Sequence, residues 1–123
     1  MKLFLDDVRH PQDCLMYMHR RIGKLNPIYA EEWVIVRNYV EFCATVKENV
    51  DIITHISFDH DLADIHYDPT TWTESFIYHE ETGYDCALYV KEYYAMVNND
   101  LPIMFVHSMN AVGTERIINL FKK

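Results

Sequence analysis

Four short apolar runs alternate with more polar segments, and this alternation constrains the fold more than any other feature of the sequence. The runs are residues 2–5, 33–36, 52–58 and 103–106. Each has the length of a buried strand, and helical patterns precede the third and fourth runs. Strands that alternate with helices form parallel neighbours joined by right-handed crossovers. We therefore predict a three-layer α/β fold, with a mainly parallel sheet of four to five strands and helices on both faces.

Helices are expected at four places along the chain. We expect them over residues 13–22, 39–49 and 82–97, and from residue 113 or 114 to residue 121. Pro11 predicts a loop after the first strand, because proline disfavours the helical conformation in the residue before it. Residues 63–81 show no period, and so long a loop beside a site predicts a lid.

Apolar residues at helical spacing predict the buried face of each of the last three helices. In chain order they are Val40, Phe42, Cys43 and Val46, then Ala87, Leu88, Val90, Tyr94 and Val97, and finally Ile117, Ile118 and Phe121. The strand over residues 103–106 is predicted to be buried as well.

Composition favours one folded domain spanning residues 1–123. Half of the residues are apolar and 14% are aromatic, which suffices for a core. The net charge of −8 argues against a surface for duplex nucleic acid, and no apolar run approaches the roughly 20 residues that span a bilayer. The first strand reaches acidic residues too soon for a signal peptide, and the three cysteines show no metal-binding spacing. We expect a cytoplasmic protein with reduced thiols.

Three of the four strands are followed directly by residues with catalytic chemistry. These are Asp6 and Asp7, then Asp59, His60 and Asp61, and then His107, Ser108 and Asn110. The remaining strand is followed by Arg37 and Asn38. Parallel strands end at one edge of the sheet, where open α/β proteins bind ligands, so we expect these side chains to converge. Taken alone, the run from Asp59 to Asp61 could bind a metal, hold a proton-transferring histidine, or lie in a solvated loop.

Two compatible chemistries suit the converging set. In the first, Asp6, Asp7 and Asp59 hold a hard divalent cation such as Mg²⁺, which prefers carboxylate and phosphate oxygens. In the second, His60 and His107 act as a general acid and base on a phosphodiester.

Polar side chains around these groups suit a phosphate ligand. Ser108, Asn110 and either Arg37 or Arg9 would steady its non-bridging oxygens. The sequence contains no Walker loop, GxSxG, HExxH or dinucleotide fingerprint, so nucleoside-triphosphatase, serine hydrolase, zincin and dehydrogenase functions lack support.

The strand-end residues belong to five longer motifs. They are residues 3–11 (LFLDDVRHP), 33–37 (WVIVR), 56–62 (ISFDHDL), 82–85 (TGYD) and 106–113 (VHSMNAVG). In this order, and over nearly the whole chain, they resemble the cyclic-phosphate-processing receiver-like family, small proteins common in bacteria and their phages. The resemblance implies a flavodoxin-like fold similar to that of response-regulator receiver domains. It also implies activity on cyclic phosphate linkages in nucleotides.

The residue pattern and the resemblance together predict the members of the site. The predicted catalytic residues are His60, His107 and Asp59, the substrate-binding residues are Arg9, Arg37, Asp61, Asp85, Ser108 and Asn110, and the metal ligands are Asp6, Asp7 and Asp59. Asp59 falls near the phosphate-accepting aspartate of receivers. The lysine that signalling receivers present after their last strand is replaced by His107 and Ser108, which weakens a phosphorelay function.

The leading hypothesis is a phosphoesterase that opens a cyclic phosphate of a nucleotide or nucleotide derivative, with Mg²⁺ as the candidate cofactor. Its expected partner is a small phosphorylated nucleotide-type ligand, not duplex nucleic acid or a membrane. The alternative is a non-enzymatic receiver-like module that binds a nucleotide signal or a protein partner.

Overall fold

The strands of the sheet end level with one another, and this alignment positions the site. The computed structural model describes residues 1–15, 27–62, 82–108 and 110–122. Within them the sheet is parallel, in the order β2-β1-β3-β4, and its strands are β1 (Lys2–Leu5), β2 (Val34–Val36), β3 (His55–Phe58) and β4 (Ile103–Val106). Leu5 lies opposite both Val36 and Phe58, and Phe58 lies opposite Val106. The residues that follow all four strands therefore share one edge.

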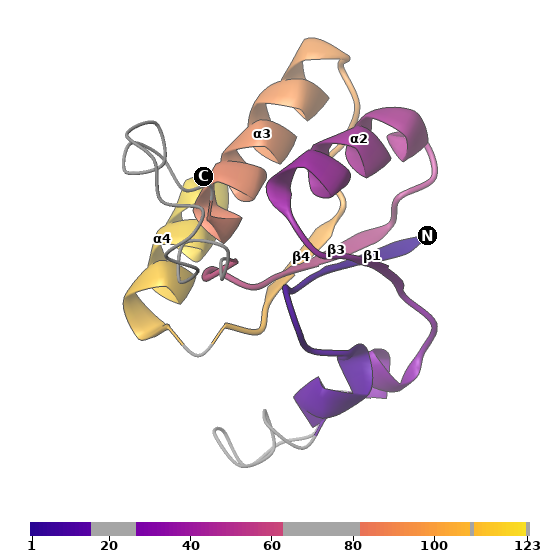
Figure 1. Ribbon diagram of the computed structural model, residues 1–123. Coiled ribbons are helices and arrows are strands. Elements are labelled where there is room, and N and C mark those ends of the chain that lie inside the picture. The colour runs from indigo at the N-terminus through magenta and orange to yellow at the C-terminus, as the bar shows by residue number, and fades with distance from the viewer. Residues whose placement is uncertain (16–26, 63–81, 109, 123) are drawn as a thin grey trace, which may run out of the picture.

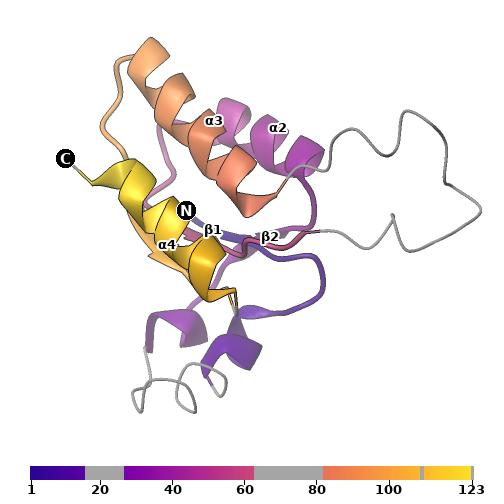
Figure 2. The same ribbon diagram turned by 90° about the vertical axis from the view of Figure 1, so that its left-hand side faces the viewer.

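Helices cover both faces of this sheet. On one face lie α2 (Tyr39–Asn49), α3 (Gly83–Met96) and α4 (Ala111–Phe121), with α3 packed between the other two (Figure 1). The 3₁₀ helix η1 (Pro27–Ala30) and the helical residues 11–15 lie on the opposite face (Figure 2). The predicted three-layer α/β fold with a parallel sheet is confirmed.

Strand alternation sends apolar side chains into a core on each face. The larger core joins Leu3 and Leu5 of β1 and Ile56 and Phe58 of β3 to the helices α2, α3 and α4. The smaller core, on the other face, is built around Phe4. Its other fully or nearly buried members are Cys14, Tyr29 and Trp33. Alternate residues of a strand point to the same face, and Phe4, Ser57 and Phe105 lie opposite one another in the sheet. Residues 6, 57 and 107 therefore project toward the smaller core, as Phe4 does.

Several predicted element boundaries are wrong by a few residues. Pro11 begins a helical segment instead of a loop, because its missing N–H is harmless in a first turn. The Asp13 carboxylate accepts a hydrogen bond from the His10 N–H at 2.8 Å, so Asp13 lies inside that turn and does not precede it. β3 begins at His55 after a turn, and α4 begins at Ala111, two or three residues before its predicted start, because Asn110 caps it.

Some predicted core positions are exposed. The side chain of Val40 is 76% exposed in the first turn of α2, while Phe42 and Val46 are buried as predicted. Val97 lies beyond the end of α3, and Ile118 faces outward on α4. β4 is an edge strand, and its Ile103 is 57% exposed. Periodicity identified α2, α3 and α4, but the buried face of each helix is narrower than its stripe of apolar residues.

Two predicted elements fall outside the described residues. They are the helical segment beyond residue 15, as far as residue 22, and the lid over residues 63–81. In the part of the chain that the structure describes, every helix is too short or too polar to cross a membrane.

Candidate functional site

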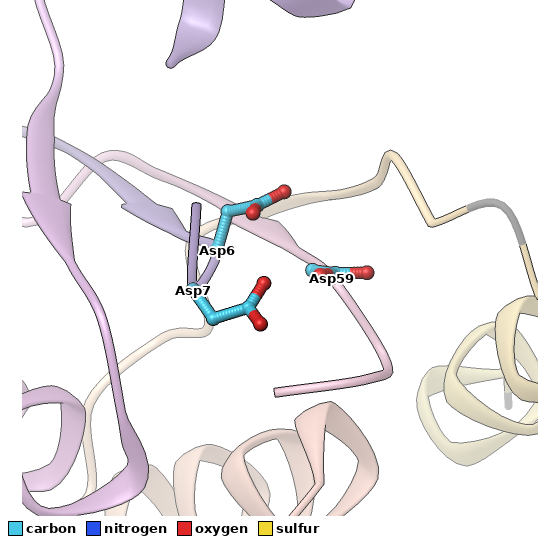
Figure 3. A group of neighbouring side chains, drawn as sticks. All are labelled: Asp6, Asp7 and Asp59. Atoms are coloured by element: carbon cyan, nitrogen blue, oxygen red, sulfur yellow. The ribbon is translucent and has the colours of Figure 1, made fainter. Parts of the chain in front are cut away.

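Three carboxylates gather where β1 and β3 end. Asp6 and Asp7 follow β1, and Asp59 follows β3. Each contributes an oxygen that lies within 4.8 Å of the other two, and Figure 3 shows the three side chains around one small space. The predicted convergence of these three residues is therefore observed. Three clustered carboxylates form an oxygen donor set that fits a hard cation such as Mg²⁺.

Two of these carboxyl groups differ strongly in their electrostatic environment. Burial and the neighbouring charge of Asp6 raise the pKa of Asp59 to about 7, although the Arg9 charge opposes this rise. Burial would also raise the pKa of Asp6, but hydrogen bonds from His107 and from two backbone N–H groups, with the Arg9 charge, lower it overall. Asp6 is therefore ionised at neutral pH, while Asp59 holds its proton about half of the time at pH 7.

Asp6 is fixed by donors on both of its oxygens. Its Oδ1 accepts hydrogen bonds from the backbone N–H groups of Val8 (3.0 Å) and Arg9 (2.8 Å). Its Oδ2 lies 3.1 Å from both Arg9 Nε and His107 Nε2. A carboxylate has about four acceptor positions, so the hydrogen bonds to Asp6 nearly fill them. Of the two buried carboxylates, Asp59 is therefore the more available ligand.

The two arginines predicted to bind substrate have different environments. Arg9 bridges the site, because its Nη2 also lies 3.6 Å from Asp59 Oδ1. Arg37 Nη1 donates hydrogen bonds to the carbonyl oxygens of Asp6 (3.1 Å) and Arg9 (2.8 Å), which holds the loop after β1 in place. The geometry therefore favours a supporting role for Arg37 and a place in the site for Arg9.

His107 lies beneath the site, on the side of the smaller core. Its side chain is 0% exposed, and its ring is stacked on Phe4 with centroids 4.3 Å apart. Its Nε2 meets Asp6 Oδ2, and its Nδ1 lies 2.7 Å from Ser57 Oγ. Burial lowers the pKa of His107, although its hydrogen bond to Asp6 opposes this, so the ring is neutral. Both ring nitrogens are occupied within the protein.

His60 lies nearer to the surface than His107, and one of its ring nitrogens is buried without a partner among the described residues. Its side chain is 12% exposed, and its Nδ1 lies 2.9 Å from Asp61 Oδ1. Its Nε2 has no hydrogen-bond partner among the described residues. Both Nδ1 of His60 and Oδ1 of Asp61 lie 3.4 Å from Nδ2 of Asn110. No contact in the described part of the chain joins His60 to His107, so the two histidines have separate environments.

The remaining predicted substrate residues take part in helix caps. Asn110 Oδ1 accepts a hydrogen bond from the Gly113 N–H at 2.8 Å and so caps α4. Ser108 is buried, and its Oγ accepts from the Asn110 N–H at 3.0 Å. Asp85 Oδ2 accepts from the Thr82 N–H at 2.7 Å, at the start of α3. These caps fix the loops around the site, and substrate binding by the same side chains stays a prediction.

Two glycines let the helices approach the end of β3 closely. A Cβ on Gly83 would overlap the carbonyl oxygen of Asp59, and the Gly83 N–H donates to the His60 carbonyl at 2.7 Å. A Cβ on Gly113 would overlap the ring of His60. The absence of a side chain at both positions is therefore needed for the present geometry of Asp59 and His60.

Sequence reasoning missed two residues behind the site. Tyr29 OH lies 2.7 Å from Ser57 Oγ, which in turn contacts His107. One signal was present: Ser57 is a hydroxyl inside an apolar strand, and a buried hydroxyl needs a partner. Nothing in the sequence pointed to Tyr29 as that partner, because it lies in a segment with no clear strand or helix pattern.

One comparison with known proteins identifies the family of this chain. A family model described as the cyclic-phosphate processing Receiver domain matches residues 1–123. The chain belongs to this family. It is a receiver-like domain of cyclic-phosphate processing, as its motifs indicated. Neither the curated proteins nor the solved structures gave a significant match.

Proposed function

We propose that this chain is a phosphoesterase that opens a cyclic phosphate of a nucleotide or nucleotide derivative, with Mg²⁺ as its cofactor. The observation that carries the proposal is the trio of Asp6, Asp7 and Asp59, whose oxygens lie within 4.8 Å of one another. Without a metal, Asp59 is buried and lies beside other carboxylates. These two effects raise its pKa to about 7. A divalent cation would relieve this repulsion and bring a phosphate to the same edge.

Asp7 and Asp59 would hold the cation, and Asp6 would join them as far as its existing hydrogen bonds allow. Bound there, Mg²⁺ supplies positive charge that polarises a phosphoryl oxygen and stabilises negative charge on the phosphate. Arg9 lies between Asp6 and Asp59 and would add a second positive charge on the phosphate oxygens.

His60 is the group that we assign to proton transfer. Its Nδ1 is held by Asp61, while its Nε2 has no partner in the described parts of the chain. Opening of a cyclic phosphate by water forms one P–O bond and breaks one ring P–O bond. The attacking water loses a proton and the leaving oxygen gains one, so the step needs a positioned group that exchanges protons. His60 Nε2 would make this exchange, because no other hydrogen bond in the described parts of the chain engages it.

His107 is less suited to direct contact with substrate. Its ring is completely buried, and both nitrogens already have partners. The predicted general acid and base pair of His60 and His107 therefore receives support for His60 only, and a direct role for His107 stays a prediction.

The proposal is tested by incubating the folded protein and Mg²⁺ with cyclic mononucleotides, cyclic dinucleotides and RNA with 2′,3′-cyclic ends. The products are then identified by mass and by ³¹P NMR. We expect conversion of at least one cyclic phosphate to a linear phosphate ester, and its loss with excess EDTA. Binding of a nucleotide without turnover would instead support the non-enzymatic receiver-like module.

A further inference from the structure

A continuous chain of hydrogen bonds runs from the smaller core to the site. It begins at Tyr29 OH, which lies 2.7 Å from Ser57 Oγ, and continues over 2.7 Å from Ser57 Oγ to His107 Nδ1. His107 Nε2 then lies 3.1 Å from Asp6 Oδ2. Tyr29, Ser57, His107 and Asp6 are all buried, so water does not compete for these bonds.

The direction of every bond in the chain follows from its end at Asp6. The ionised carboxylate of Asp6 can only accept, so His107 Nε2 carries the proton and donates it. In the neutral ring Nδ1 must then accept, which makes the Ser57 hydroxyl a donor. Ser57 Oγ in turn accepts from the Tyr29 hydroxyl. Each group thus has one role, and the chain selects one tautomer of His107.

Packing holds the same chain from the sides. The His107 ring is stacked on Phe4 with an interplanar angle of 6°, and it meets the Tyr29 ring edge-on at 6.2 Å. Tyr29 is itself stacked on Trp33 at 5.6 Å. The ring of His107 therefore has little freedom to turn away from Asp6.

We propose that Tyr29 and Ser57 are positioning residues of the site, which act through His107 to hold the Asp6 carboxylate and, through it, Arg9. This inference rests on the proposed metal-dependent function and names residues behind the site that set its geometry. The backbone N–H groups of Val8 and Arg9 hold one oxygen of Asp6. The hydrogen-bonded chain of Tyr29, Ser57 and His107, called the relay below, holds the other oxygen. Arg9 Nε lies 3.1 Å from this same oxygen.

The relay also joins the site to the crossover between β1 and β2. Tyr29 is the buried residue of η1, which lies in that crossover, whereas Ser57 belongs to β3 and His107 follows β4. The relay therefore links elements that are far apart in the sequence to Asp6. A change at Tyr29 is expected to reach the site although Tyr29 touches none of the three clustered carboxylates in the described contacts.

The test compares Tyr29→Phe and Ser57→Ala with the matched control Tyr94→Phe. Tyr94 is also buried, at 1% exposure, but its hydroxyl has no hydrogen-bond partner among the residues that the structure describes, and it belongs to the core on the other face. Each protein is titrated with Mg²⁺ by calorimetry after circular dichroism has shown that it is folded.

We expect Ser57→Ala to weaken Mg²⁺ binding about tenfold, at the lower end of the range for residues that support metal ligands. Tyr29→Phe, one hydrogen bond further from the metal ligand, should weaken it by less, about threefold. Tyr94→Phe should leave the affinity within about twofold of wild type. The double variant of Tyr29 and Ser57 should bind no more weakly than Ser57→Ala alone, because both changes interrupt one chain. Equal affinities in all variants, or fully additive losses, would overturn the inference.

A second readout needs no metal. Nitrogen-15 NMR of the His107 ring should show the Nε2–H tautomer in all of these proteins, because Asp6 sets it, and in wild type and Tyr94→Phe the Nδ1 resonance of a nitrogen that accepts a hydrogen bond. In Ser57→Ala the Nδ1 resonance should shift to that of a nitrogen without a donor. If wild type binds no Mg²⁺, the proposed metal-dependent function is wrong. The NMR spectrum alone then tests whether the relay exists. An Nδ1 resonance that is the same in Ser57→Ala as in wild type would then refute it.

Discussion

Arg9 Nη2 ends 3.6 Å from the Oδ1 atom of Asp59. This separation is too long for a good hydrogen bond, although it still allows electrostatic attraction. Asp59 is thus buried beside other carboxylates with incomplete compensation, whereas Asp6 has donors on both oxygens. This asymmetry explains the opposite pKa shifts of the two aspartates, and it makes Asp59 the more sensitive probe of the site.

The first prediction concerns stability without metal. The pKa of Asp59 is about 7 in the folded state and 3.8 as its ordinary value, so the folded protein binds more protons between these pH values. The contribution of Asp59 to the unfolding free energy therefore falls as pH rises from about 4 to about 7. Asp59→Asn removes this charge. It should be more stable than wild type by roughly 2–4 kcal/mol at about pH 8, with little gain at about pH 4.

The difference between the two proteins is the quantity to measure, by urea unfolding across this pH range in EDTA. His107 acts in the opposite direction, because its lowered pKa makes stability rise with pH up to its ordinary value of 6.5. That contribution is present in both proteins and largely cancels in the difference. A stability difference that does not change with pH would show that Asp59 is not protonated as described.

The second prediction concerns metal affinity. Protons compete with a cation for the Asp59 carboxylate, so only its ionised form is ready to bind. With a pKa of about 7, raising pH from about 6 to about 8 should strengthen Mg²⁺ binding about tenfold. Calorimetric titrations at several pH values test this. An affinity that is independent of pH over this range would place the cation away from Asp59.

The third prediction separates His60 from an ordinary surface histidine. His60→Gln should lower turnover by roughly 10²- to 10⁴-fold if His60 exchanges the proton. The matched control is His55→Gln, because His55 lies at the other end of the same strand and its Nδ1 contacts Thr54 Oγ1. The control should keep nearly full activity. Equal activity of the two variants would remove His60 from the chemistry.

The fourth prediction uses the two glycines. Gly113→Ala places a methyl group against the base of the His60 ring, so this side chain must change its rotamer, and activity should fall with a loss of stability of about 1 kcal/mol. Gly83→Ala places it against the backbone of Asp59, which cannot turn away, so the loss should be about 3 kcal/mol. Thermal unfolding and turnover of both variants test this, and the reverse order of stability losses would contradict it.

The sequence predicted the sheet well because its signals are local. Alternating apolar runs located β1 and β4 to the residue, and helical spacing located α2 from Tyr39 to Asn49. Parallel topology then placed Asp6 and Asp59 at one edge. Helix starts were less predictable, because Asn110 and Pro11 act through cap geometry that spacing alone does not reveal.

The contacts among the site residues could not be predicted from the strand ends alone. Two histidines at one sheet edge suggested a catalytic pair. The alternation of side chains along β4 instead directs His107 to the face of the smaller core, where it stacks on Phe4, while His60 packs against Gly113. Arg37 looked like an anion ligand, but it donates to the backbone of the β1 loop. Such partners depend on contacts between distant segments, which periodicity does not encode.

The most direct test of the central claim follows a cyclic phosphate substrate by ³¹P NMR with wild type and Asp59→Asn, in Mg²⁺ and in EDTA. We predict conversion to a linear phosphate ester by wild type in Mg²⁺. We predict at least about a hundredfold slower conversion by Asp59→Asn or in EDTA, because the charge of the metal site is then lost. Turnover that is equally fast in EDTA and in Asp59→Asn would contradict a metal-dependent phosphoesterase centred on Asp6, Asp7 and Asp59.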